Sequence, residues 1–332
     1  MLDLSEAARD AYSLVEMASR MELSEGELRR RLVAAGLPLD VALIRDLQPA
    51  KPRAPRAALG MVEEAARRVE AYPPTESDIV RLSLPSDRQS VIILTGDWHL
   101  GEAGVDYRRF AKDAQAIAAG HEAYPGQLQV IGMGDFIGGF MKSGTPSSVA
   151  QILSPHEQRT AAIEAFDLLR PAVLIEADHD IWHKNQDDEN DWVNDFCQDT
   201  GTPYAQWGVE ASLETGRNWN PKLLARHRMS GSRKANPWRP QLEVHRRYGP
   251  AEIVGCAHFH CLPGVQRLSS DRLRDERFWA FQSGTYKFFD EYARKLGVSH
   301  GEYGVPAFVI DPQGASITGY TRFEDALQTL GR

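Results

Sequence analysis

The sequence lacks several features that would mark out particular classes of protein. It has only three cysteines, Cys197, Cys256 and Cys261, an odd number whose spacing matches no disulfide framework. It has no apolar run of about 18 residues or more, and its amino terminus has neither a basic start nor an apolar segment of the signal-peptide type. We therefore expect a cytoplasmic protein with no membrane partner, in which each cysteine is a small buried side chain.

Positive charge is also in short supply. The 332 residues include 38 lysines and arginines against 46 aspartates and glutamates, for a net charge of -8. This balance argues against a protein that coats nucleic acid indiscriminately, although a local basic strip could still contact it. Hydrophobic content of 42% and charged content of 25% are ordinary for globular proteins, which argues against wholesale disorder or a fibrous repeat.

Residues 1–48 have helical spacing of apolar side chains. Ser24 and Glu27 are placed to form a capping box at the start of a helix that carries arginines at 29–31. Two short helices with a tight turn resemble a helix-turn-helix unit, although Glu22 stands where such turns usually have glycine. The alternative is a small helical cap with a solvated arginine face, and both interpretations stay open.

The rest of the chain divides into two regions that differ in composition. Residues 49–85 contain a proline- and arginine-rich linker followed by a connecting helix. From residue 86 to 332, short apolar runs alternate with helical stretches such as 107–121 and 156–169. This alternation predicts an α/β domain in which helices cover the strands.

Acidic and histidine side chains follow five of these apolar runs. In chain order the residues after the runs are Asp97 and His99, Asp135, Asp178 with His179 and Asp180, His227, and His258 with His260. They include five of the ten histidines in the chain. Because α/β sheets gather their sites at one edge, we expect these side chains to lie together.

Each of these residues has an ordinary explanation when taken alone, because aspartate next to glycine is common in turns. Together they would be costly to bury without a cation, whereas divalent metals match such a set directly. Mixed nitrogen and oxygen ligands suit Mn²⁺, Fe or Zn²⁺ better than Mg²⁺ or Ca²⁺. The pattern therefore predicts a metal site, and we favour manganese.

The ordered series "GDWH", "GMGD", "ADHD", "ARH" and "AHFH" resembles the five-block pattern of calcineurin-like metallophosphoesterases. The resemblance spans residues 91–260, about half of the chain. It implies two packed mixed β-sheets flanked by helices in a four-layer αββα arrangement, with the small helical region preceding it. The stretches "FWAFQSGTYKFFDEYARKLG" and "FEDALQTL" are similar to a phage-encoded branch, which would place the protein in the host cytoplasm.

The resemblance also implies roles for the residues at the strand ends. Two divalent ions would be held, one by Asp97, His99 and His260 and the other by Asp178, His227 and His258. Asp135 would bridge them, and the ions would share a hydroxide for in-line attack on phosphorus. His179 would face the leaving group as general acid, since in an extended chain it cannot easily point to the same metal as its neighbour. The alternative role for His179 is a further ligand of the second metal.

The sequence departs from the family pattern at several positions. Asp178 replaces the family's asparagine, and Ala177 and Ala257 replace glycines. The added carboxylate should tighten divalent binding while lowering the Lewis acidity of the metal it touches. The family often has an aspartate or histidine that orients the catalytic histidine, but Gly138 occupies that place, so the sequence leaves the orienting group unidentified.

A basic segment at 217–247 favours nucleic acid as the substrate. Trp219 and Trp238 interleave with its charges, a mixture that can follow a phosphate backbone and stack bases. The candidate substrate-binding residues are Arg226, Arg228, Arg233 and Lys234. The alternative is a solvated loop that neutralises the acidic stretch 185–199.

Three functions are consistent with these observations. The leading hypothesis is a dinuclear metal-dependent phosphodiesterase, a nuclease whose partner is DNA, with the amino-terminal helices as a docking module. A phosphomonoesterase or small-nucleotide hydrolase is the second. The third is a non-catalytic nucleic-acid-binding protein that keeps a structural metal site.

Overall fold

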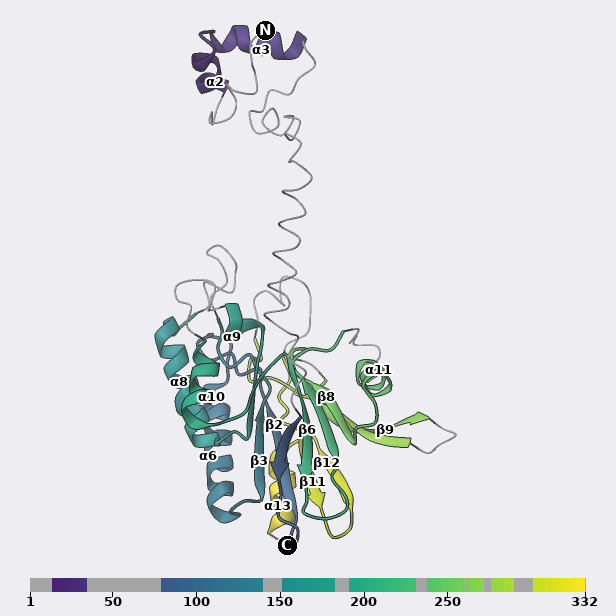
Figure 1. The fold of residues 1–332 in the computed structure, drawn as a ribbon. Coiled ribbons are helices and arrows are strands. Elements are labelled where there is room, and N and C mark those ends of the chain that lie inside the picture. Colours follow the sequence, from purple (N-terminus) through teal and green to yellow (C-terminus); the bar gives the residue numbers. More distant parts are fainter. Residues whose placement is uncertain are drawn as a thin grey trace. The chain divides into compact units, whose positions relative to one another are not determined.

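A computed structural model describes residues 14–34, 79–139, 151–182, 191–230, 238–260, 262–271, 276–289 and 301–331 (Figure 1). Contacts within the chain divide it into two units, Met1–Thr75 and Glu76–Arg332. The connecting helix expected within 49–85 lies outside the described residues, as do Arg233, Lys234 and Cys261. The domain boundaries at 48 and 85 stay predictions.

The first unit contains two short helices, α2 (Leu14–Arg20) and α3 (Glu25–Ala34). They pack through a small apolar core that consists of Leu14, Met17, Ala18, Met21, Leu28 and Leu32. Between the helices Glu22 has a φ of 55°, so it adopts the left-handed conformation for which glycine is the usual residue. The turn thus forms without the glycine that is usual in helix-turn-helix units.

The start of α3 has half of the expected capping box. The backbone N–H of Glu27 donates to the Ser24 hydroxyl at 3.2 Å, whereas the Glu27 carboxylate pairs with Arg30 at 2.8 Å and Arg31 at 2.9 Å. Arg29 pairs in the same way with Glu25 at 2.7 Å. All three arginines are therefore engaged by acidic groups of their own helix, as on a solvated helix face.

The second unit contains two six-stranded sheets, both of mixed strand direction. One sheet has the order β1 (Val80–Ser83), β6 (Gly208–Glu214), β7 (Lys222–Arg226), β8 (Ile253–Cys256), β10 (Glu276–Gln282), β9 (Gly264–Asp271). The other has the order β12 (Ser316–Tyr320), β11 (Ala307–Asp311), β2 (Ser90–Thr95), β3 (Leu128–Gly132), β4 (Val173–Glu176), β5 (Tyr204–Gln206). Strand β1 falls within 49–85, where the sequence indicated no strand.

The helices of this unit cover the outer faces of both sheets. They are α6 (Tyr107–Ala123), α8 (Pro155–Leu169), α9 (Asp178–Trp182), α10 (Trp192–Thr200), α11 (Arg239–Tyr248) and α13 (Phe323–Leu330). The helical stretches expected at 107–121 and 156–169 are confirmed as α6 and α8. None of the helices in the described ranges is both long and apolar enough to cross a membrane.

Three apolar cores separate four layers. Helices α6, α8, α10 and α13 pack on the outer face of the β2 sheet, and α11 packs on the outer face of the β8 sheet (Figure 1). Between the sheets, Ile92 and Ile131 of the β2 sheet share an apolar cluster with Leu223 and Ile253 of the β8 sheet. The predicted α/β fold, with two packed mixed sheets flanked by helices, is confirmed.

The strand directions decide where the candidate site lies. Strands β2, β3 and β4 are parallel neighbours, and so are β7 and β8 in the other sheet. Strand β2 is buried at all six positions, which explains why its sequence is a continuous apolar run. The predicted ligands after β2, β3 and β4 therefore follow the same edge of one sheet, and those after β7 and β8 follow the same edge of the other.

Candidate metal centre

The loops after these five strands place the predicted ligands together. Asp97 and His99 follow β2, and Asp135 follows β3. His227 is the residue after β7, and His258 and His260 follow β8. The N–H of His258 donates to Oδ2 of Asp97 at 2.7 Å, which links loops from the two sheets. Within one sheet, the N–H of His99 donates to the carbonyl of Asp135 at 3.0 Å and links the loops after β2 and β3.

One group of possible metal ligands consists of Asp97, His99 and His260. One ligand atom from each lies within 4.8 Å of the others. Nε2 of His260 is 3.3 Å from Oδ1 of Asp97 and 3.0 Å from Nε2 of His99. These are the three residues to which the sequence assigned the first metal.

A second group consists of Asp135, His227 and His258, again with ligand atoms within 4.8 Å of one another. Nε2 of His227 is 3.2 Å from Oδ2 of Asp135 and 3.1 Å from Nδ1 of His258. Asp178, assigned to the second metal from the sequence, lies beside this group, with Oδ2 3.6 Å from Nδ1 of His258. The role of Asp178 as a ligand of the second metal and the bridging role of Asp135 both stay predictions.

Five of these candidate ligands have an unusual backbone conformation. Asp97, His99, Asp135, His258 and His260 have φ angles between 49° and 73°. Residues other than glycine rarely adopt this left-handed region, which costs about 1–3 kcal/mol each, and such residues cluster at functional sites. The loops therefore hold these side chains in place at the expense of local backbone strain.

The chemistry of the side chains fits divalent cations. Oδ1 of Asp97 is buried and has no hydrogen-bond partner among the described residues. Unpaired polar atoms of this kind are costly in a protein interior. Two pairs of imidazole nitrogens also face each other at 3.0 and 3.1 Å, an arrangement that leaves lone pairs directed at the same space. Mixed imidazole and carboxylate groups suit Mn²⁺, Fe or Zn²⁺.

Charge interactions within the second group are strong. Burial disfavours a charged imidazole at His227, but the carboxylate of Asp135 outweighs this effect and raises the pKa of His227 to about 10. Burial would raise the pKa of Asp135, yet the adjacent His227 and His179 hold it well below its usual value. Burial and then the charge of His227 lower the pKa of His258. In the absence of metal, His227 and Asp135 therefore form an ion pair at neutral pH.

We expect metal binding to release a proton from His227. Because folding raises the pKa of this residue from 6.5 to about 10, the ion pair stabilises the metal-free protein fully below pH 6.5 and is lost as the pH rises through about 10. A cation must displace that proton, so metal affinity should increase with pH over this window. Calorimetric titration with Mn²⁺ at about pH 8, in buffers of different ionisation enthalpy, should show about one proton released per His227. The variant His227→Asn should release none, and equal proton release by both proteins would contradict the assignment.

His179, the predicted general acid, lies next to both groups. It is the second residue of α9, so the condition of an extended chain, on which its separation from Asp178 was argued, is not met. Neighbouring helical side chains still point about 100° apart, which separates the two. The His179 backbone N–H donates to Oδ1 of Asp135 at 2.9 Å, and its Nε2 is 3.9 Å from Oδ2 of the same residue. Its ring meets that of His99 edge to face at 4.6 Å.

The orienting partner of His179 is a backbone group. Nδ1 of His179 is hydrogen-bonded to the carbonyl oxygen of Gly138, the residue that stands where the family often has an orienting side chain. A Cβ atom at Gly138 would lie only 2.6 Å from Cγ of Glu102, so a side chain is excluded there. If Nδ1 donates to this carbonyl, Nε2 carries a lone pair when the imidazole is neutral and a transferable proton when it is charged.

Two residues of the site were missed in the sequence. Glu102 is buried and places Oε1 3.4 Å from Nδ1 of His99 and Oε2 2.6 Å from Nζ of the buried Lys287. Carboxylates beside metal-binding histidines commonly fix the ring and its tautomer. The position of Glu102 three residues after His99 was the available signal. Nothing local in the sequence points to Lys287.

Asp180 has a structural role that its motif did not reveal. Its buried carboxylate accepts the backbone N–H groups of Asp135 at 2.8 Å, Phe136 at 3.0 Å and Ala177 at 3.2 Å. It therefore ties the loop after β3 to the loop after β4. The left-handed conformation of Asp135 is held in part by this contact.

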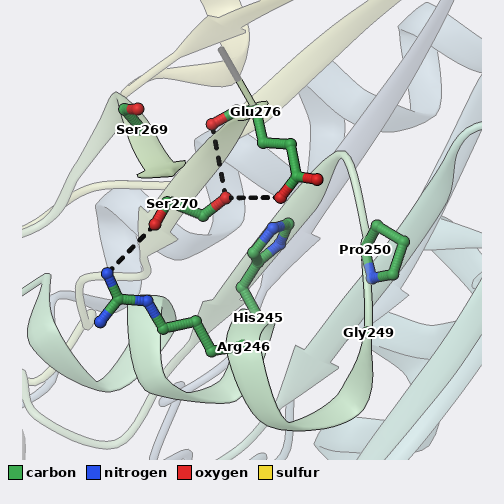
Figure 2. A pocket seen from close by; sticks show the side chains of 7 residues that line it. All are labelled: His245, Arg246, Gly249, Pro250, Ser269, Ser270 and Glu276. Atoms are coloured by element: carbon green, nitrogen blue, oxygen red, sulfur yellow. Dashed lines mark hydrogen bonds between the residues drawn. The ribbon is translucent and has the colours of Figure 1, made fainter. Parts of the chain in front are cut away.

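The predicted substrate-binding residues divide into two sets. Arg226 and Arg228 flank His227 and line a cavity of about 270 Å³. Arg233 and Lys234 lie outside the described residues. A cavity of about 680 Å³ lies elsewhere, beside the end of α11 (Figure 2), and the described residues that line it include none of the candidate metal ligands.

Comparisons with known proteins add little to this geometry. No protein-family model and no curated protein sequence matches the chain. Among solved structures, the chain is similar to a 5'-nucleotidase precursor from Thermus thermophilus, with 9% sequence identity and a TM-score of 0.35. The match covers 70% of this chain and 54% of that structure, so the chain spans about half of the length of the protein it matches. A likeness this distant does not bear on what the chain acts on.

Proposed function

We propose that the protein is a dinuclear metal-dependent phosphodiesterase of the calcineurin-like metallophosphoesterase type. The observation that carries this proposal is the convergence of two groups of possible ligands at the ends of parallel strands from both sheets. The order and residue types of the five motifs, which resemble that family, support the same conclusion. Two separate carboxylate and imidazole groups are what a pair of divalent ions requires.

Asp97, His99 and His260 would hold one ion. Asp135, His227 and His258, with Asp178 beside them, would hold the other. When bound, the ions would supply an activated water nucleophile and neutralise charge that grows on the phosphoryl oxygens. Glu102 keeps the ring of His99 in place, and the carbonyl of Gly138 orients His179. His179 would then donate a proton from Nε2 to the leaving oxygen, a contribution of about 10²–10⁴ in rate.

The proposed substrate is nucleic acid, with DNA favoured. The support is local charge, because Arg226 and Arg228 flank His227 and neither forms an ion pair within the described part of the chain. Both line one cavity beside His227, a position that suits contacts to a phosphate next to the scissile one. The arginines of α3, by contrast, are paired within their own helix, which weakens the case for α3 as a DNA-reading helix.

A substrate panel tests this function. With Mn²⁺, we expect purified full-length protein to hydrolyse DNA at least about tenfold faster than p-nitrophenyl phosphate, because the arginines around the site favour a charged polymer over a monoester. Bis(p-nitrophenyl) phosphate, a small diester, should also be hydrolysed. Single-stranded and double-stranded DNA and a cyclic nucleotide complete the panel. Chelation with EDTA should abolish every activity.

Each alternative function would give a different result. A preference for the monoester or the cyclic nucleotide would support a phosphomonoesterase or small-nucleotide hydrolase instead. Protein that binds DNA and Mn²⁺ but hydrolyses nothing in the panel would support a non-catalytic role with a structural metal site. High salt should reduce activity on DNA much more than activity on the small diester if charge contacts guide the polymer.

A further inference from the structure

A basic cavity lies next to the proposed metal centre, at the end of β7. It encloses about 270 Å³ and is lined by residues that include Arg226, Arg228, Arg247 and Tyr248. Sites for drug-sized ligands usually enclose about 300–1,000 Å³, so this cavity suits a smaller group. We propose that it binds a backbone phosphate of the nucleic acid, adjacent to the phosphate at the metal centre. This inference rests on the proposed function and adds Arg247 and Tyr248 to the substrate-binding residues.

Within the part of the chain that the structure describes, the three arginines of the cavity have no acidic partner. Arg226, Arg228 and Arg247 form no ion pair with any residue in the described ranges. Glu243 also lines the cavity, but its carboxylate is paired with Arg239 at 2.7 Å. Three guanidinium groups around one small space repel each other unless an anion lies between them. Arginine binds phosphate, as it binds carboxylate, through two parallel hydrogen bonds.

The position of Arg226 is fixed by its neighbours. Its guanidinium lies 4.6 Å from the centre of the Tyr248 ring, a cation–π contact that orients the charged plane. On the paired strand β6, a Cβ atom at Gly208 would lie 2.6 Å from Cγ of Arg226. Glycine therefore leaves the room that the Arg226 side chain occupies. Tyr248 is also half exposed, which leaves part of its side chain open to a base or sugar.

The cavity is within reach of a strand bound at the metal centre. Arg226 and Arg228 are the immediate neighbours of His227, and their side chains point to the other side of the chain because residues alternate in extended backbone. A polymer with one phosphate at His227 and His258 would therefore have its next phosphate near these arginines.

A neighbouring arginine provides a matched control. Arg246 also lies in the last turn of α11, next to Arg247 in the sequence. Figure 2 shows its guanidinium directed away, toward the carbonyl of Ser270, to which it donates a hydrogen bond at 3.1 Å. The carboxylate of Glu276 lies by the same serine, 3.2 Å from its hydroxyl, and offsets positive charge in that cavity. Arg246 and Arg247 thus match in type and helix but face different cavities.

The test is binding of a fluorescein-labelled single-stranded oligonucleotide to the full chain in EDTA, followed by anisotropy. We expect Arg247→Gln to weaken binding about fivefold and Arg247→Glu more, with the salt slope of log K reduced by about one. Arg246→Gln and Arg246→Glu should change binding less than about twofold. Inorganic phosphate should compete with the oligonucleotide on the wild type but less well on Arg247→Gln.

The outcomes separate this inference from the proposed function. Equal binding by Arg247→Gln and the wild type, or equal losses in the Arg246 and Arg247 variants, would overturn the phosphate site even if the protein hydrolyses DNA. Binding that depends on Arg247 in a protein without hydrolytic activity would uphold the site and reject the phosphodiesterase. Absence of oligonucleotide binding by the wild type would overturn the nucleic-acid assignment.

Discussion

Replacement of Asp135 by asparagine is expected to lower metal-dependent hydrolysis of bis(p-nitrophenyl) phosphate at least about 10²–10³-fold. Its Oδ2 is 3.2 Å from Nε2 of His227 and its Oδ1 accepts the backbone N–H of His179 at 2.9 Å. Asparagine can keep the second contact through its amide oxygen but removes the negative charge. The loss should therefore come from weaker metal binding rather than from unfolding.

Metal content and thermal unfolding should be measured on the same preparation. We expect Asp135→Asn to bind less Mn²⁺ and to lose the increase in melting temperature that Mn²⁺ gives the wild type. Asp87→Asn is the matched control, because Asp87 is an exposed carboxylate at the opposite end of β2. Wild-type activity in folded Asp135→Asn would rule out a metal centre built on this residue.

The second large effect is expected at His179, and it should depend on the leaving group. If His179 protonates the leaving oxygen, His179→Gln should slow hydrolysis of DNA by about 10²–10⁴-fold. Bis(p-nitrophenyl) phosphate has a leaving group that departs without a proton, so the same variant should lose less than about tenfold on it. Glutamine can still reach the carbonyl of Gly138 through its amide group.

His179 has the alternative role of a metal ligand, and the experiment distinguishes the two. Equal losses on both substrates, together with reduced Mn²⁺ content, would indicate a ligand rather than a general acid. Ligand atoms of His99, Glu102 and His179 also lie within 4.8 Å of one another, so the described geometry groups His179 with a ligand of the first metal and not of the second. His156→Gln, at an exposed histidine of α8, should behave as the wild type on both substrates.

The strand-end motifs could be read directly from the sequence because their causes are local. Strand β2 is apolar at nearly every position since both of its faces are buried, and the residues that follow it end the strand. Parallel neighbours end at the same edge, so a series of acidic and histidine residues after such runs predicts a cluster. The α/β class with two mixed sheets was predictable for the same reason, together with the family resemblance.

Other features of the site depend on contacts that no local pattern encodes. Asp135 lies near His227, and Glu102 contacts Lys287, although each pair is far apart in the sequence. The backbone partner of His179 could not be found by a search for side chains. Likewise, helix α9 begins at Asp178, where the motif alone suggested an extended chain.

The sequence by itself determined which chemical groups reach the ends of the strands. The reason is that runs of apolar residues mark the buried strands, and the residues that follow each run lie at its end. Only the tertiary structure decided which of these groups lie together in each set of possible metal ligands. Left-handed backbone at Asp97, His99, Asp135, His258 and His260 aims each side chain, and packing of two sheets brings β7 and β8 against β2 and β3. Such placement depends on long-range packing, which can hold strained loops that local preferences would disfavour.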